Sequence, residues 1–296
     1  MTDTLDLEQL TLTRLRHPER IGEMWARRRR RPLGSDVERL LFVAADHPAR
    51  GALAVRGESM AMESRGDLLR RLAEALRRPG VDGVLGTPDI LEDLLLLGLL
   101  EDKIVIGSMN RGGIAGASFE FDDRFTAYDA PHLAAAGIDG GKMLLRIALD
   151  DADTAPTLQA CADAVTDLAR HRLMAMVEPF WSRRDHRGRV GNLLDPDSVI
   201  TSIHVAAGIG ATSAYTWLKL PVVEDMPRVL DATTLPALLL GGDPRENPDV
   251  TFGRWQEALA HPVARGLVAG RTLLYPPDGR VAEAVDVASG IVHTTT

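Results

Sequence analysis

The chain contains almost no cysteine. Its 296 residues include a single one, Cys161. A lone cysteine excludes a framework of disulfides within the chain and is typical of a protein from a reducing compartment. Cys161 lies in the segment LQACADAVTDLARH, whose apolar spacing predicts a helix. We therefore expect a small core residue here rather than a nucleophile.

Long apolar runs are also missing. The most apolar one, ILEDLLLLGLL, is interrupted by Glu92 and Asp93 and is too short to cross a bilayer. The N-terminal segment MTDTLDLEQLTLTRL is acidic and lacks the apolar core of a secretory signal. We therefore expect a cytoplasmic protein without a membrane partner. The formal net charge of -8 and the pI of about 5.5 argue against nucleic acid as a partner.

The histidines show no spacing typical of metal ligands. The chain has eight of them, and no pair forms an HxH or HExxH pattern. We expect neither a metal nor another cofactor, with metal-dependent catalysis as the rival chemistry. No GxGxxG follows an early strand, which argues against a dinucleotide-binding fold.

Lysine is the scarce basic residue. Only three of the 34 Lys and Arg residues are lysines: Lys103, Lys142 and Lys219. Lys103 follows Glu101 and Asp102, where a solvated side chain is expected. Lys142 and Lys219 lie instead in apolar, strand-like runs, where an ammonium is costly to bury. Lysine, unlike arginine, can lose its proton near neutral pH and act as an amine nucleophile.

Short apolar runs alternate with helical patterns along the chain. They predict strands at 40–45, 83–86, 103–107, 142–147, 172–178, 214–220, 236–242 and 266–270. Amphipathic helices fill the gaps, for example at 66–78, where Leu68, Leu69, Leu72 and Leu76 share one face. This alternation predicts a (β/α)8 TIM barrel of the α/β class, with a doubly wound open sheet as the alternative. We expect a helical extension at 1–33 and a single barrel domain at 34–296.

Five consecutive arginines, at 27–31, precede Pro32. Such a run could contact an anion or a nucleic acid. The simpler interpretation is a cationic helix C-terminus ended by Pro32, where positive charge is favourable to the helix dipole.

The catalytic groups of a TIM barrel stand at the C-terminal ends of its strands. The polar side chains expected there are Asp46 and His47 after the first strand, Asn110 and Arg111 after the third, Lys142 and Arg146 on the fourth, Glu178 at the end of the fifth and Lys219 on the sixth. The last two strands lead to Gly241 and Gly242, and to Gly270 and Arg271. Glycines at these two ends fit the phosphate site common in this fold, and the arginine could add a bidentate contact.

Strand alternation sorts these side chains into inward and outward sets. If Lys219 points into the barrel, Tyr215 and Trp217 do so too, whereas Leu218 and Leu220 face the helices. The same rule groups Lys142 with Leu144 and Arg146, Glu178 with Met174 and Met176, and Asp46 with Ala44. The fourth and sixth strands have the same parity, so their two lysines can lie near each other across the barrel.

Two inward lysines beside a carboxylate support Schiff-base chemistry. Burial and a neighbouring cation both lower the pKa of an amine, and the neutral amine can attack a ketone. The resulting iminium withdraws electrons from a carbon–carbon bond, while Glu178 or Asp46 moves the proton of a substrate hydroxyl. The alternative is structural: interior lysines that only form ion pairs with Glu178, and an Asp46–His47 strand-end cap.

Several short segments carry these residues in order. They are AADHPARGAL with Asp46 and His47, FTAYDAPHLAAAGIDGGKMLLRI with Lys142, MVEPF with Glu178, YTWLKLPV with Lys219, and AGRTLLY with Gly270 and Arg271. From about residue 40 to 280 the chain resembles class I aldolases of the tagatose-1,6-bisphosphate and DhnA/deoxyribose-phosphate aldolase type. It is most similar to an actinobacterial, aldolase-like branch of inositol catabolism. One departure is His47, where the tagatose branch has a glutamine.

The resemblance implies a role for each residue. Lys219 would form the Schiff base, Lys142 would be the second active-site lysine, and Glu178 would be the general acid/base. Asp46 would orient a hydroxyl, and Gly270 with Arg271 would contact phosphate. The substrate implied is 5-dehydro-2-deoxyphosphogluconate, cleaved to dihydroxyacetone phosphate and malonate semialdehyde.

We therefore expect a metal-independent class I aldolase that acts on a phosphorylated keto-sugar or keto-acid and assembles as a homo-oligomer. The residues expected to hold the substrate and its phosphate are His47, Arg111, Arg146, Gly241, Gly242, Gly270 and Arg271. Two alternatives stay open: a barrel that binds a sugar phosphate without catalysis, as a sensor or partner protein, and an isomerase that uses Glu178 as a base.

Overall fold

Eight parallel strands close into a barrel in the computed structural model, which describes residues 5–33, 39–242 and 247–294. The strands are β1 (Leu40–Ala44), β2 (Gly83–Gly86), β3 (Ile104–Ser108), β4 (Gly140–Ile147), β5 (Met174–Arg184), β7 (Thr216–Pro221), β8 (Ala237–Leu240) and β9 (Ala264–Ala269). They follow the order β4-β3-β2-β1-β9-β8-β7-β5, and a further pairing of β4 with β5 closes the cylinder. The predicted (β/α)8 TIM barrel is confirmed.

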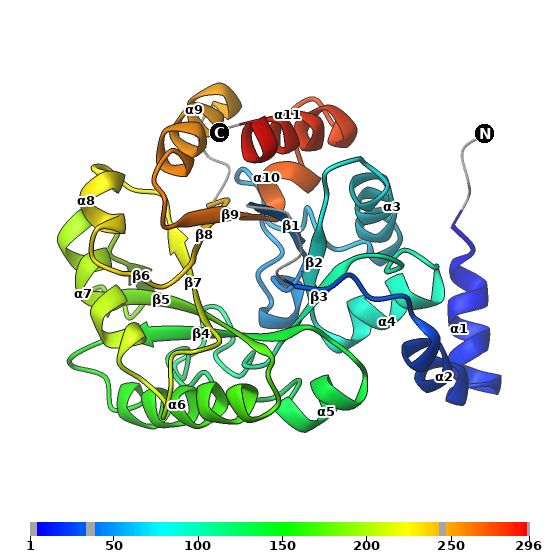
Figure 1. The fold of residues 1–296 in the computed structure, drawn as a ribbon, viewed down its shortest axis with the longest axis horizontal. Helices are drawn as coiled ribbons and strands as arrows, with labels where there is room; N and C mark the ends of the chain where they lie inside the picture. Colours follow the sequence, from blue (N-terminus) through cyan, green and yellow to red (C-terminus); the bar gives the residue numbers. More distant parts are fainter. Residues whose placement is uncertain (1–4, 34–38, 243–246, 295–296) are drawn as a thin grey trace.

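Helices surround the strands (Figure 1). They are α3 (Arg65–Leu76), α4 (Pro88–Leu96), α5 (Ala130–Ala135), α6 (Thr154–Arg170), α7 (Pro196–Ala207), α8 (Met226–Leu230), α9 (Pro248–Leu259), α10 (Arg271–Leu274) and α11 (Val281–Thr294), with a 3-10 turn, η1, at Pro48–Arg50. The helix predicted at 66–78 is α3, and its four leucines are buried as expected. Cys161 is buried on α6, which confirms it as a core residue.

Two helices, α1 (Leu7–Arg16) and α2 (Glu19–Arg27), precede the barrel. Figure 1 shows them outside the ring of helices, with α2 beside α4. The expected boundary between extension and barrel, 33/34, adjoins residues 34–38, which lie outside the described ones.

The alternation of side chains along the strands separates two apolar clusters. Phe42 of β1, Met176 of β5 and Leu238 of β8 belong to a cluster inside the barrel, whereas the flanking Leu41 and Val43 belong to the one between strands and helices. On β7 the alternation is as predicted, since Leu218 and Leu220 pack outward and Trp217 packs against the interior cluster. Tyr215, which was expected to share that inward set, precedes the strand.

Strand β5 is longer than predicted. It was expected to end at Glu178, but it continues to Arg184 and pairs antiparallel with β6 (Val190–Asn192) in a hairpin. Its pairing with β7 stops at Val177, opposite Leu218. Glu178 therefore lies where the closed barrel ends, although the strand itself runs further.

The run of arginines is not the helix end that the simpler interpretation predicted. Helix α2 ends at Arg27, and the chain then crosses the N-terminal ends of the barrel strands. The guanidinium of Arg28 is buried and donates to the carbonyls of Lys103 and Gly137, at 2.8 Å each. Arg30 pairs with Asp139 at 2.8 Å. These arginines tie the N-terminal segment to the loops before β3 and β4.

The C-terminal helix, α11, contacts the same face of the barrel, at the N-terminal ends of the strands. Asp82, just before β2, pairs with Arg31 at 2.6 Å and accepts the backbone N–H of Leu41 at 2.7 Å. His293, in the last turn of α11, lies 3.4 Å from the same carboxylate and 2.8 Å from the carbonyl oxygen of Gly80. The hydrogen bond with Asp82 raises the pKa of His293 above its usual value of 6.5, against the effect of burial.

Replacing His293 with glutamine is expected to lower the free energy of unfolding by about 1 kcal/mol at pH 6 and by less at pH 9. Because the folded-state pKa is the higher one, the stabilisation is complete below about pH 6.5 and is lost as the pH rises through the folded-state value. Urea unfolding of both proteins at the two pH values measures this difference. His186→Gln, in an exposed turn, serves as the control. A difference that stays constant or grows with pH would contradict the assignment.

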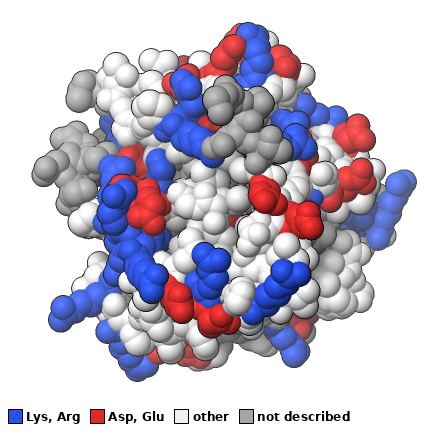
Figure 2. All heavy atoms as spheres, turned by 90° about the vertical axis from the view of Figure 1, so that its right-hand side faces the viewer, with Lys and Arg blue, Asp and Glu red and all other residues white. Residues whose placement is uncertain are grey.

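No helix of the described residues is both long enough and apolar enough to cross a membrane. The face that lies to the right in Figure 1 carries Lys and Arg side chains interspersed with Asp and Glu (Figure 2).

Candidate active site

Three barrel strands and the loop after a fourth bring charged side chains together at the C-terminal end of the barrel. Lys142 is the third residue of β4, in register with Ser108 at the end of β3 and Met176 of β5. Glu178 of β5 pairs in register with Leu144, two residues further along β4. Lys219 lies on β7, next to β5 in the sheet, and Asp46 follows β1. Residues far apart in the chain thus contact one another at this end of the barrel.

The carboxylate of Glu178 lies between the two lysines. Its Oε1 accepts from Lys219 Nζ at 2.7 Å, and its Oε2 pairs closely with Lys142 Nζ. All three side chains are buried, with exposed residue fractions of 7% for Glu178, 4% for Lys219 and 1% for Lys142. The structure therefore brings together the two lysines and the carboxylate that the sequence selected, and Lys219 faces inward.

Asp46 forms the other side of this cluster. Its Oδ2 lies 3.2 Å from Lys142 Nζ and 2.6 Å from Arg111, and it accepts from the Ser108 hydroxyl at 3.3 Å. Arg111 in turn donates from Nε to Ser108 Oγ at 2.8 Å. The contacts link Asp46 to β3, β4 and the loop after β3, so its carboxylate is fixed in place.

These contacts shift the pKa values of the ionisable groups. Burial would raise the pKa of Glu178, but Lys142 and Lys219 lower it to about 2. Burial would also raise the pKa of Asp46, but Arg111 and Lys142 hold it well below its usual range. Burial and the cation of Arg111 lower the pKa of Lys142 to about 8, against the pull of Asp46 and Glu178. Both carboxylates are thus ionised at neutral pH, and Lys142 loses its proton at a lower pH than an ordinary lysine does.

His47 stands at the rim of the cluster, next to Asp46. Its Nδ1 lies 3.8 Å from Asp46 Oδ1, too far for a hydrogen bond. Burial lowers the pKa of His47 to about 3, with smaller contributions from Arg271 and Lys219 that act against Asp46. The ring is therefore neutral at neutral pH.

The expected phosphate-binding residues lie at the ends of β8 and β9. Gly241 accepts at its carbonyl from Thr272 Oγ1 at 3.0 Å, and Gly242 has a φ of +70°. A side chain at Gly270 would come within 2.5 Å of the Ala44 carbonyl and 3.2 Å of the His47 ring, so only glycine fits there. Arg271 donates to the Ala54 carbonyl at 3.2 Å. The four residues border one edge of the barrel mouth, and their contact with phosphate stays a prediction.

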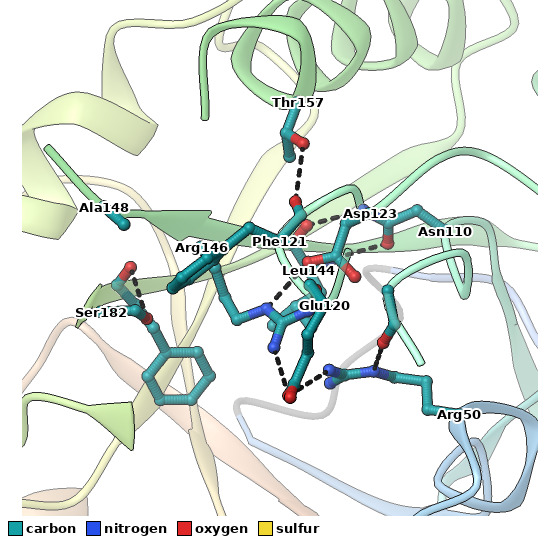
Figure 3. Close-up of polar contacts among 12 residues, drawn as sticks. Arg50, Asn110, Glu120, Phe121, Asp123, Leu144, Arg146, Ala148, Thr157 and Ser182 are labelled. Atoms are coloured by element: carbon teal, nitrogen blue, oxygen red, sulfur yellow. Dashed lines mark hydrogen bonds and ion pairs between the residues drawn. The ribbon is translucent and has the colours of Figure 1, made fainter. Parts of the chain in front are cut away.

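Arg146 is not part of the lysine cluster. It points into the barrel further along β4 and is bonded to the loop after β3, with Nε 2.9 Å from Asp123 Oδ2 and one terminal nitrogen 2.9 Å from Glu120 Oε1 (Figure 3). Arg50, from the turn after β1, lies 3.5 Å from the same Glu120 oxygen and donates to the Gly113 carbonyl at 2.9 Å. A contact between Arg146 and the substrate stays a prediction.

Asn110 has a structural contact in this region. It is fully buried, donates to the Leu144 carbonyl at 2.6 Å and accepts the Leu144 N–H at 2.7 Å (Figure 3). These two bonds attach the start of the loop to the middle of β4.

Sequence reasoning missed Ser108, Arg50, Glu120 and Asp123. Ser108 is the last residue of β3, and its position at a strand end was a signal that could have selected it. The other three lie in loops, where no periodicity indicates which arginine meets which carboxylate. Among the described residues, no group of three or more His, Cys, Asp and Glu side chains could hold a metal ion.

The sequence matches the Cgl0159-like family over residues 38–289, most of its length. The chain belongs to the Cgl0159-like family. The structure of Cgl0159 from Corynebacterium glutamicum is 56% identical, with a TM-score of 0.94, and the match covers 98% of this chain and 97% of that one.

More distant solved structures share the fold with this Cgl0159-like protein. An archaeal fructose 1,6-bisphosphate aldolase is 16% identical with a TM-score of 0.63, over 93% of this chain and 99% of that one. A fructose-bisphosphate aldolase from Slackia heliotrinireducens is 13% identical with a TM-score of 0.65, over 100% and 92% of the two chains. At such identities the likeness concerns the barrel alone. A search of curated proteins finds no match.

Proposed function

We propose that this protein is a class I, metal-independent aldolase that acts on a phosphorylated keto-sugar or keto-acid. The observation that carries the proposal is the position of Glu178, whose buried carboxylate bridges the amines of Lys142 and Lys219 at the C-terminal end of the barrel. Schiff-base catalysis needs an amine that can lose its proton and a carboxylate that can take it, and both are in contact here.

Lys219 is the proposed nucleophile. Its ammonium contacts one carboxylate, Glu178, whereas that of Lys142 contacts both Glu178 and Asp46. A lysine held by two carboxylates keeps its position, so Lys142 suits a supporting role. Lys219 is fixed by one carboxylate alone, and its side chain is the more exposed of the two lysines.

The proposed steps move one proton between Lys219 and Glu178. The ammonium of Lys219 passes a proton to Glu178 Oε1, 2.7 Å away, and the neutral amine attacks the substrate carbonyl to form a carbinolamine. Protonated Glu178 returns the proton to the departing hydroxyl, so water leaves and the iminium forms. The regenerated carboxylate then takes the proton of the substrate hydroxyl as the carbon–carbon bond breaks, and the electron pair moves to the iminium. Asp46 and Lys142 orient that hydroxyl.

The mouth of the barrel and the names of distant structural neighbours support the proposed substrate class. Gly242 and Gly270 offer backbone N–H groups and Arg271 a guanidinium for a phosphate, with His47 beside them, whereas the Gly241 N–H donates to the Val268 carbonyl at 3.0 Å. The archaeal protein and the one from Slackia heliotrinireducens are both described as fructose-bisphosphate aldolases. Within this class we propose 5-dehydro-2-deoxyphosphogluconate as the first candidate, from the resemblance to the inositol-catabolism branch.

Release of dihydroxyacetone phosphate from this compound, and from fructose and tagatose 1,6-bisphosphates, tests the function. The assay is run with and without a chelator. We expect cleavage of at least one substrate, unaffected by the chelator. Binding of these compounds without cleavage would replace the proposal with a sugar-phosphate sensor. Interconversion of ketose and aldose without cleavage would indicate an isomerase, and loss of activity with chelator would indicate metal catalysis.

A further inference from the structure

The buried cluster at the end of the barrel contains more positive than negative groups. Among the residues that the structure describes, the cations Lys142, Lys219 and Arg111 contact only two carboxylates, Asp46 and Glu178. None of the five residues is more than 7% exposed. An unbalanced charge is costly at such a depth, and one of the three cations can reduce the cost by losing its proton.

Arg111 is the one cation that cannot lose its proton. A guanidinium keeps its charge at any pH at which a protein is folded, whereas a lysine amine yields when buried beside another cation. The excess charge that Arg111 brings must therefore be relieved at Lys142 or Lys219.

The geometry directs this effect to Lys142. Arg111 and Lys142 both contact Asp46 Oδ2, and Arg111 lies closer, at 2.6 Å against 3.2 Å. Arg111 is held there by Ser108 Oγ, and its backbone N–H donates to Thr126 Oγ1 at 3.3 Å. The negative charge of Asp46 is thus shared with a fixed competitor, which leaves less of it to stabilise the Lys142 ammonium.

We propose that Arg111 is a positioning residue that makes the Lys142 ammonium easier to deprotonate, by holding Asp46 in place and by adding a permanent positive charge beside Lys142. This inference rests on the proposed function for its purpose, since Lys142 is proposed there to orient the substrate hydroxyl, and a Lys142 amine that gives up its proton readily can exchange one with that hydroxyl. The charged groups facing Lys142 are Asp46 after β1, Arg111 after β3, Glu178 of β5 and Lys219 of β7. The lowered pKa of Lys142 agrees with this inference, because Arg111 is the strongest of the neighbouring charges that lower that pKa.

The scarcity of lysine makes the proposal directly measurable. A chain labelled with ¹³C at the lysine Cε gives three signals, one for each lysine of the sequence. Lys→Arg substitution at each position assigns them. In Arg111→Met we expect the midpoint of the Lys142 titration to rise by at least about one pH unit. Arg124→Met is the matched control, because Arg124 lies in the same loop but is exposed and pairs with Asp122.

The outcomes are distinct. An unchanged or lowered midpoint in Arg111→Met would overturn the proposal, as would an equal rise in Arg124→Met. If Arg111→Met does not fold, Arg111→Gln keeps polar contacts to Ser108 and Asp46 without the charge, and the same rise is expected. The titration needs no substrate. A raised midpoint in a protein that cleaves nothing would therefore sustain this inference and reject the aldolase.

Discussion

Lys219→Met is expected to lower turnover by about 10⁴-fold or more, because the substitution removes the amine that forms the covalent intermediate. The methionine side chain has a similar length and suits the partly apolar interior near Trp217. Steady-state cleavage rates, measured on protein whose circular dichroism and unfolding midpoint show that it is folded, test this expectation.

Two further variants separate the loss of the amine from the loss of a charge. Lys219→Arg keeps a cation for Glu178 but has no nucleophilic amine, and we expect the same loss of turnover. Lys103→Met removes a lysine whose amine donates to the Val81 carbonyl, at the opposite end of the barrel, and turnover should stay unchanged. If Lys219→Arg kept a tenth of the wild-type rate, the covalent role would be wrong.

Glu178→Gln is expected to lower turnover by about 10²- to 10⁴-fold, the usual size of a general acid/base contribution. The amide can still contact both lysines, but it cannot accept the proton of Lys219 or of the substrate hydroxyl. Glu178 is ionised at neutral pH, because the two lysines lower its pKa to about 2, so the carboxylate is in the form that can accept a proton. A matched change at the barrel rim, Glu120→Gln, removes a carboxylate that contacts Arg146 and Arg50 but not the lysines.

The kinetic pattern distinguishes a catalytic from a structural role. We expect Glu178→Gln to reduce kcat with little change in KM, and Glu120→Gln to have a much smaller effect on kcat. Equal losses in both variants would indicate that the carboxylates support folding of the barrel mouth in general. Turnover within tenfold of the wild type in Glu178→Gln would reject Glu178 as the acid/base.

Much of the fold could be predicted because buried positions recur at regular intervals along strands and helices and are occupied by apolar residues. Strands buried on both faces appear as apolar runs, and the alternation of inward and outward positions follows from strand geometry alone. That is why Lys219, Glu178 and Asp46 could be selected before any contact was known. The scarcity of lysine also helped, because a chain that uses arginine for most of its cations has only three lysines to consider.

Contacts made by loops could not be predicted in the same way. Nothing in the run at 27–31 indicates that Arg28 reaches the loops before β3 and β4, because those partners are more than 70 residues away. The length of β5 depends on a hairpin with β6 that has no apolar pattern. A substrate contact by Arg111 stays a prediction, whereas its ion pair with Asp46 could not be predicted, because it depends on the closed barrel that brings the loop after β3 next to the end of β1.

The most direct test of the central claim is the position of the trapped intermediate. The protein is incubated with dihydroxyacetone phosphate, reduced with borohydride, digested, and its peptides are mapped by mass spectrometry. We predict a single reduced adduct on Lys219, in the peptide that contains Trp217 and Leu220. An adduct on Lys142 or Lys103 instead, or no adduct with this or related keto-phosphates, would contradict the account.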